Sequence, residues 1–92
     1  MGATFEWDPA KDEANRRRHG VPFREALSAF MDPLSLTIPD PDHSLEEERL
    51  LLLGENHKGQ LLVVSHTDRH DRIRIISVRK ADRRERKEYE QG

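Results

Sequence analysis

The chain has 92 residues and a formal net charge of -2 at pH 7, and 37% of its residues are charged while 34% are apolar. This length allows one domain, residues 1–92, and the gathering of apolar residues into dense runs predicts a folded domain with a thin core. The absence of cysteine excludes disulfides and thiolate metal sites, and no apolar run reaches the ~20 residues of a membrane span, so we expect a cytoplasmic protein with no membrane partner.

A first helix is predicted directly after a short extended segment, Phe5–Trp7. Asp8 offers a side-chain oxygen for the N-cap, and Pro9 fits the first helical position because its missing N–H needs no partner there. The helix should extend to about His19, where Gly20 can adopt the left-handed conformation that ends a helix. Because it has few apolar residues, this helix should lie on the rim of the domain.

A second helix should begin at Pro22 and end at Asp32, because the residue before Pro33 resists helical geometry. Its apolar residues follow the i, i+3, i+4 and i+7 spacing of a helix with one buried face. These residues are Phe23, Ala26, Leu27 and Phe30.

After Pro33 the apolar period changes to two, which is typical of strands. The predicted strands cover residues 34–38, 49–53, 61–67 and 72–78. Short turns between successive strands favour antiparallel pairing. Asp82 and Glu85 form a capping-box pair, so a last helix should begin near Arg83. The predicted fold class is α+β, with two N-terminal helices, a four-stranded antiparallel sheet and a C-terminal helix.

Positive charge is concentrated near the end of the chain. Residues 69–87 contain nine Lys or Arg and three Asp or Glu, a local balance of +6 in a chain whose net charge is -2. A basic patch on an otherwise acidic small domain indicates a polyanionic partner, usually nucleic acid. The candidate RNA-binding residues of this block are Arg69, Arg72, Lys80, Arg83, Arg86 and Lys87. The alternative is a solvated helix face stabilised by pairs of charges four residues apart.

Several segments match one protein family. They are FEWDPAK (5–11), RHG (18–20), FREALSAFMDP (23–33), HTDR (66–69) and RIRIISVRKA with the trailing RRERKEYE (72–90). On these segments the chain resembles BrnT-type toxins, the toxin halves of bacterial type II toxin–antitoxin pairs, which share the RelE/ParE-like fold. It departs mildly from the family pattern at two positions, with Val78 where Ala is common and Asp82 where Thr is usual.

The resemblance implies a ribonuclease that cuts RNA and thereby inhibits translation. It also implies a cognate ribbon-helix-helix antitoxin, a complex of two toxins with two antitoxins, and contact with operator DNA only through the antitoxin. By motif position it points to Arg74, Arg79, Glu85 and Tyr89 as catalytic residues.

Metal-free RNA cleavage requires stabilisation of a doubly charged phosphorane, a task that suits arginine because its fork donates two charge-assisted hydrogen bonds to phosphate oxygens. Arg74 and Arg79 are the leading candidates. Five positions separate them, so strict alternation puts them on opposite faces of a strand unless it ends or bulges before Arg79. If Arg79 stays on the helix-covered face, it is instead an ion-pair partner for Glu85 or Glu88.

His66 is a further candidate acid or base, chosen for its chemistry, because histidine titrates near neutrality and this one ends a strand beside the basic turn. A hydrogen-bonded structural histidine is the alternative interpretation. Tyr89 could also stack on a base. We expect no cofactor and no metal, because His66 and His70 lie at a strand end and turn, whereas zinc pairs at this spacing use a helix.

A competing function remains open. The chain could be a non-enzymatic toxin or corepressor that binds its antitoxin or another protein without cleaving RNA. The lack of an obvious nucleophile or strong base in the sequence keeps this alternative open. It predicts growth or DNA-binding effects with no loss of RNA.

Overall fold

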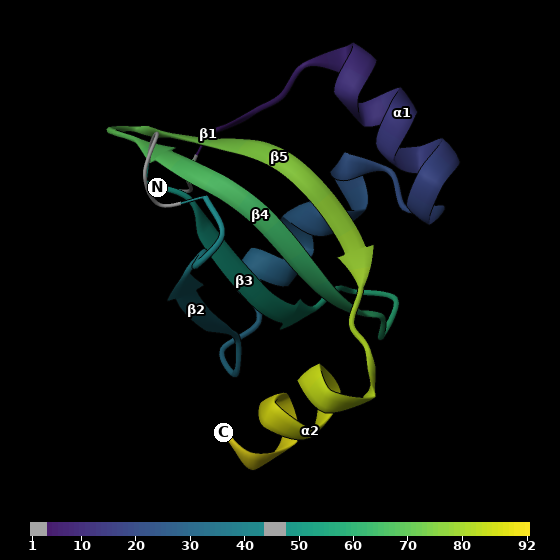
Figure 1. The fold of residues 1–92 in the computed structure, drawn as a ribbon, viewed down its shortest axis with the longest axis vertical. Coiled ribbons are helices and arrows are strands. Elements are labelled where there is room, and N and C mark those ends of the chain that lie inside the picture. The colour runs from purple at the N-terminus through teal and green to yellow at the C-terminus, as the bar shows by residue number, and fades with distance from the viewer. Residues whose placement is uncertain (1–3, 44–47) are drawn as a thin grey trace.

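The computed structural model describes residues 4–43 and 48–92. The elements in chain order are β1 (Thr4–Glu6), α1 (Pro9–His19), the 3-10 helix η1 (Phe23–Met31), β2 (Leu36–Pro39), β3 (Leu50–Glu55), β4 (Leu61–Arg69), β5 (Arg72–Lys80) and α2 (Arg83–Gln91). Figure 1 shows α1 beside β5, η1 against the back of the sheet, and α2 beyond the end of β5. The sequence also predicts a polar loop over residues 39–48, of which residues 44–47 lie outside the described residues.

The prediction of a four-stranded antiparallel sheet is wrong. The sheet has five strands in the order β1-β5-β4-β3-β2, and β1 runs parallel to β5, with Thr4 opposite Arg72 and Glu6 opposite Arg74. The strands β2 to β5 pair antiparallel in sequence order, as expected. The segment predicted as an extended lead-in is therefore a strand, and its three residues are too few to display an alternating pattern.

The prediction of two N-terminal α-helices is also wrong, because the second is the 3-10 helix η1. Its fully buried residues are Phe23, Ala26 and Ala29, which recur every three residues as the 3-10 geometry requires. Leu27 and Phe30, which an α-helical stripe would also bury, are only partly buried at the edge of the core. The spacings i and i+3 occur in both kinds of helix, so the apolar pattern alone could not separate them.

The main core lies between η1 and one face of the sheet, which we call the core face. Its largest fully buried side chains on the strands are Leu62, Val64, Ile75 and Val78. The packing of η1 on β3 is so close that a Cβ on Gly54 would lie 2.8 Å from the carbonyl oxygen of Ala29. Glycine at this position therefore allows η1 to touch the sheet backbone.

The helix α1 follows the predicted bounds and caps. The Asp8 side chain accepts a hydrogen bond from the Ala10 N–H, and Gly20 adopts a left-handed conformation with φ of 77°. The buried residue of α1 is Asn15, whose side-chain amide donates to Val78 O at 2.9 Å and accepts from Val78 N at 3.1 Å. Asn15 thus pairs with the backbone of β5 where β1 no longer covers it, which protects an edge that would otherwise stay open.

Candidate functional site

A β-bulge interrupts the pairing of β4 with β5. Ser65 lies opposite Ser77, whereas the next residue of β4, His66, lies opposite Ile75. Ile76 is therefore an extra residue of β5 with no partner in β4. Because side chains alternate between the two faces of a strand, one extra residue changes which later side chains share a face.

The bulge places Arg74 and Arg79 on the same face of the sheet. Arg74 lies opposite Thr67 and Arg79 lies opposite Val63, and these β4 residues are four positions apart on an unbroken strand. The two arginines therefore point to the side opposite the core face, which we call the arginine face. The sequence left two arrangements open, and the structure combines them: a bulge precedes Arg79, and Arg79 is also an ion-pair partner of Glu85.

The arginine face has a polar half and an apolar half. The polar half, at the β4–β5 turn, carries Ser65, Thr67, Arg69, Arg72, Arg74, Ser77 and Glu6. The apolar half is a second small core, formed by Leu53, Leu61 and Val63 with the partly buried Leu36, Leu51, Ala81 and Tyr89. The helix α2 packs on this apolar half through Tyr89, and Arg79 lies at the boundary between the two halves.

Arg74 is 31% exposed and pairs with Glu6 of the neighbouring strand, with 2.9 Å between Arg74 Nη1 and Glu6 Oε2. Arg72 approaches the same carboxylate, with 3.4 Å between its Nε and Glu6 Oε1. Two guanidinium groups thus share one carboxylate, and the group of three residues keeps a net positive charge. A guanidinium has five N–H donors, so Arg74 retains donors for a further anion.

Arg79 makes a bidentate ion pair with Glu85 of α2, with Nη1–Oε1 and Nη2–Oε2 distances of 2.8 and 2.7 Å. The hydrogen bonds from Arg79 lower the pKa of Glu85, and the hydrogen bonds to Glu85 raise the pKa of Arg79. Glu85 also accepts a hydrogen bond from the Asp82 N–H, which completes the capping box that begins α2 at Arg83 as predicted. Glu85 therefore joins the start of α2 to the sheet.

The hydroxyl of Tyr89 donates a hydrogen bond to Asp32, which lies at the end of η1. This hydrogen bond raises the pKa of Tyr89 to about 12. Burial alone would raise the pKa of Asp32, but hydrogen bonds from Tyr89 and from the N–H groups of Glu55 and Leu34 lower it overall. Tyr89 keeps its proton at neutral pH, so its visible role is to hold the end of α2 against η1.

His66 lies on the core face, away from both arginines. It is 4% exposed, and its ring packs edge-on against Phe30 with 4.9 Å between the ring centroids. Its Nδ1 is 3.2 Å from the carbonyl oxygen of Val64. Burial lowers the pKa of His66. The structure therefore does not bring His66 together with Arg74 and Arg79.

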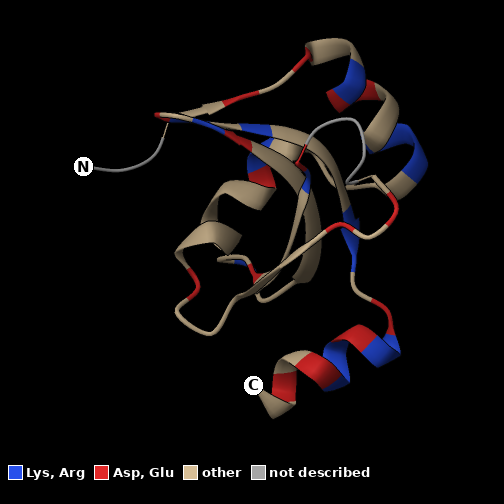
Figure 2. Cartoon of the chain, turned by 60° about the vertical axis from the view of Figure 1, so that its left-hand side comes forward, with Lys and Arg blue, Asp and Glu red and all other residues tan. Residues whose placement is uncertain are grey.

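The six candidate RNA-binding residues are exposed and fall in three places. Arg69 and Arg72 lie opposite each other at the turn end of β4 and β5, on the arginine face near Arg74. Lys80 ends β5 opposite Leu62, which places it on the core-face side of the strand end. Arg83, Arg86 and Lys87 belong to α2, where stretches of basic residues are interrupted by acidic residues (Figure 2). The basic block thus spans the sheet face and the start of α2.

Two hydroxyl side chains of β4 were not predicted as site residues. Ser65 and Thr67 lie on the arginine face, and Thr67 is 3% exposed yet its Oγ1 has no hydrogen-bond partner within the described residues. A buried hydroxyl without a partner is rare in proteins, and it lies here opposite Arg74. The alternation of β4 could have placed both residues on one face, but only the pairing shows that this face carries the arginines.

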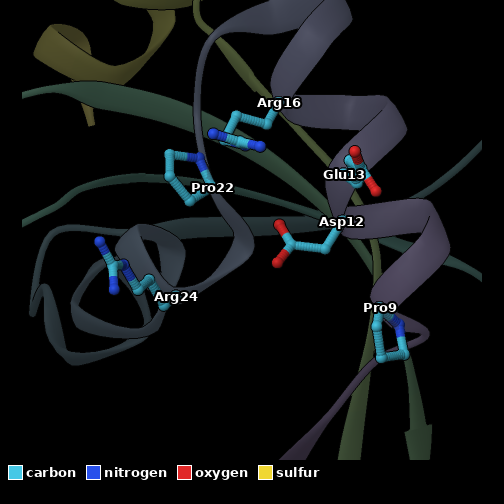
Figure 3. Close-up of a pocket in the computed structure, with 6 residues that line it drawn as sticks. All are labelled: Pro9, Asp12, Glu13, Arg16, Pro22 and Arg24. Atoms are coloured by element: carbon cyan, nitrogen blue, oxygen red, sulfur yellow. The ribbon is translucent and has the colours of Figure 1, made fainter.

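A separate cleft of about 380 Å³ lies between α1 and the start of η1 and is lined by Asp12, Glu13, Arg16 and Arg24. Figure 3 shows Asp12 pointing from α1 toward η1, and its Oδ1 accepts a hydrogen bond of 2.9 Å from the Phe23 N–H. Acidic and basic side chains balance there, and Asp12 is engaged in joining the two helices. This cleft contains none of the predicted site residues.

Residues 4–43 and 48–92 contain no group of three or more His, Asp or Glu side chains arranged to hold a metal ion. None of the helices in these two ranges is both long enough and apolar enough to cross a membrane.

The arrangement of elements is that of a solved ribonuclease toxin. The 1.1 Å crystal structure of the Brucella abortus ribonuclease toxin BrnT superposes with a TM-score of 0.72 and 22% identity, covering 89% of this chain and 100% of that one. At this identity the likeness shows a shared fold. No individually curated protein matches the chain.

The family itself is shown by the sequence. The family model described as "Ribonuclease toxin, BrnT, of type II toxin-antitoxin system" matches residues 7–85. The chain belongs to this family of type II toxins, so an antitoxin partner and an RNA substrate follow from membership.

Proposed function

We propose that this BrnT-family toxin cleaves RNA without a metal ion, at the polar half of the arginine face. The observation that supports this proposal best is the bulge at Ile76, which puts Arg74 and Arg79 on one face with the hydroxyls of Ser65 and Thr67. Two forked cations and several small donors on one surface suit a phosphate group with negative charge on its non-bridging oxygens.

The reaction uses the RNA's own 2′-hydroxyl as the nucleophile. This oxygen loses its proton and attacks the adjacent phosphorus, the bond to the 5′-oxygen breaks, and the leaving oxygen takes up a proton. The products are a 2′,3′-cyclic phosphate and a 5′-hydroxyl. Arg74 donates hydrogen bonds to the phosphorane oxygens as their charge develops, which stabilises the transition state more than the ground state.

Glu85 and Tyr89 act by positioning in this proposal. Glu85 holds the Arg79 guanidinium in a fixed plane through two hydrogen bonds, and Tyr89 fixes the other end of α2 on Asp32. A guanidinium held in place before substrate binds loses less freedom in the transition state. His66 stays outside the mechanism because it is buried on the core face.

The remaining basic residues bind the RNA backbone in this proposal. Arg69 and Arg72 flank Arg74 on the sheet, and Arg83, Arg86 and Lys87 extend the positive surface onto α2. Contacts of this kind attract RNA of any sequence and weaken with salt. Cleavage of cellular RNA by such a protein inhibits translation.

We further propose that the antitoxin is a ribbon-helix-helix protein, that two toxins and two antitoxins assemble in the cytoplasm, and that the complex reaches operator DNA through the antitoxin. The surface supports a protein partner near β2, where Met31, Leu34 and Ile38 are 80%, 66% and 54% exposed. Exposed apolar side chains close together commonly belong to an interface.

A cleavage assay in excess EDTA tests this function. The purified chain is mixed with a single-stranded RNA and with the same RNA carrying one 2′-deoxy nucleotide at the cleaved position. We expect cleavage of the first RNA only, with cyclic-phosphate or 3′-phosphate and 5′-hydroxyl ends. Products with 5′-phosphates, or cleavage that EDTA abolishes, would contradict the proposal.

The alternative is a non-enzymatic toxin or corepressor that binds its antitoxin or another protein. It is favoured by one observation, that Arg74 and Arg79 are both paired with carboxylates, to Glu6 and Glu85. In this case the folded chain would bind the antitoxin and alter its DNA binding, while RNA would stay intact both with and without translating ribosomes.

A further inference from the structure

We propose that the cleft between α1 and β5 is a second site for the RNA backbone, in which Lys11, Arg18 and His19 bind phosphate. This inference rests on the proposed function, because it assumes that the chain acts on RNA. The cleft has a volume of about 210 Å³. It is lined by Lys11, Ala14, Asn15, Arg18, His19, Ile76 and Ser77.

The sign of the charge in this cleft points to an anion. Lys11, Arg18 and His19 line it together with neutral residues, and none of the described carboxylates contributes to the lining. The cleft between α1 and η1 differs in this respect, because Asp12 and Glu13 line it beside two arginines. Of these two clefts, the one against β5 therefore presents cations without a neutralising group.

The basic side chains that line the cleft are also free to bind a ligand. Within residues 4–43 and 48–92, Lys11, Arg18 and His19 make no side-chain hydrogen bond or ion pair. The adjacent Arg17, in contrast, pairs with Glu13 at 2.7 Å. Lys11, Arg18 and His19 each offer N–H donors of the kind that phosphate oxygens accept.

The cleft is held in place by buried hydrogen bonds at its centre. Asn15 lies between Lys11 and Arg18 on one face of α1, at the i, i+4 and i+7 spacing of a helix. Its side chain bonds to both backbone groups of Val78 and to the carbonyl of Val21. These bonds fix the rotation of α1 against β5, so Lys11 and Arg18 face the cleft before any ligand arrives.

The cleft is continuous with the arginine face through Ser77. This residue lines the cleft, and it lies opposite Ser65 on the arginine face. The pairing of β1 with β5 ends at Arg74, so no strand of the described chain separates the two surfaces along the rest of this edge. An RNA strand that passes over Arg74 can therefore continue around the edge of β5 and reach α1.

A purely structural explanation also exists for Arg18 and His19, because basic residues in the last turn of a helix interact favourably with the helix dipole. That explanation predicts that replacing Arg17 and replacing Arg18 have the same effect on RNA binding, since both residues lie in the last turn of α1. A phosphate site predicts that only Arg18 affects RNA. The neighbouring arginines therefore form a matched pair.

The test is RNA binding by Arg18→Ala, Lys11→Ala and the control Arg17→Ala, measured by fluorescence anisotropy at several salt concentrations. The probe is a single-stranded RNA with 2′-O-methyl groups, which cannot be cleaved. We expect Arg18→Ala and Lys11→Ala to weaken binding roughly tenfold, as for one charge-assisted hydrogen bond. The slope of log affinity against log salt should become shallower by about 0.7 for each phosphate that is no longer neutralised. Arg17→Ala should change neither quantity.

Thermal unfolding of the three variants establishes that each is folded. If the wild-type chain binds and cleaves RNA but Arg17→Ala and Arg18→Ala have equal RNA affinities, this inference is overturned and the proposed function is left intact. A folded wild-type chain that neither binds nor cleaves RNA would overturn both.

Discussion

Arg74 and Arg79 lie on one face of β5 although an odd number of positions separates them. The extra residue Ile76 corrects the alternation, so a bulge rather than a strand end brings the two guanidinium groups to the same side. They are held differently once there. Arg74 shares Glu6 with Arg72 inside the sheet, whereas Arg79 is bound to Glu85 on a separate helix. We therefore expect mutations at the two positions to have different effects.

Arg79→Ala and Glu85→Ala should each loosen α2 from the sheet. The pair is bidentate but partly exposed, so we expect a coupling free energy of roughly 1 kcal/mol, which solvent screening keeps small. A double-mutant cycle of thermal or denaturant unfolding measures it. Hydrogen exchange in residues 83–91 should become faster in both single variants. A coupling near zero would mean that the ion pair does not hold α2.

The same pair predicts a pH dependence of stability. The pKa of Glu85 in the folded chain lies below its ordinary value of 4.5, so its contribution is fully present above that pH. The contribution is lost as the pH falls through the folded-state pKa, because the unfolded chain then binds the proton first. The difference in Tm between wild type and Glu85→Gln should therefore be constant from pH 7 to about pH 5 and shrink at lower pH. A difference that grew with acid would contradict this assignment.

Tyr89 should titrate at unusually high pH. Its hydrogen bond to Asp32 raises its pKa from 10.0 to about 12, so ultraviolet absorbance at pH 10.5 should show far less phenolate than for an ordinary tyrosine. Asp32→Asn should move the midpoint back toward 10. Because the folded-state pKa is raised, this bond stabilises the fold fully below pH 10.0 and its contribution disappears as the pH approaches 12. Tyr89→Phe should cost about 1 kcal/mol at neutral pH.

Asn15→Ala should destabilise the fold more than a substitution at an exposed position of the same helix. It removes one side chain that serves the N–H and C=O of Val78 and the C=O of Val21, leaving these groups buried without partners. We expect a loss of roughly 2–3 kcal/mol in the free energy of unfolding. Ala14→Ser, at an exposed neighbouring position, should change it by less than about 1 kcal/mol. Similar losses for both variants would show that the edge of β5 does not depend on Asn15.

Signals that involve neighbours in sequence predicted the structure well. The Asp8 cap, the Gly20 stop and the capping box of Asp82 with Glu85 are all present at the predicted positions. Each needs only a few adjacent residues, so tertiary contacts do not have to be known. The apolar segments of β2 to β5 and their antiparallel pairing were predicted in the same way, although β2 begins at Leu36 and not at residue 34.

Features that depend on distant residues were missed. The pairing of β1 joins Glu6 to Arg74 across 68 positions, and Tyr89 reaches Asp32 across 57. Nothing in the local sequence marks either partner. The position of His66 was missed for the same reason. Alternation puts His66 on the same face of β4 as Val64, but only the position of η1 reveals that this face is the core. The sequence placed most of the candidate residues on β5 and α2, and only the bulge shows that Arg74 and Arg79 share one face of the sheet.

The most direct test compares single-turnover RNA cleavage by wild type, Arg74→Ala, Arg74→Lys and the control Arg17→Ala, all in excess EDTA and with folding verified by thermal unfolding. Transition-state stabilisation by the Arg74 fork predicts a rate about 10²-fold lower for Arg74→Ala, partial recovery in Arg74→Lys and a wild-type rate for Arg17→Ala. A folded Arg74→Ala variant that cleaves at the wild-type rate would contradict the assignment of the active site to the arginine face.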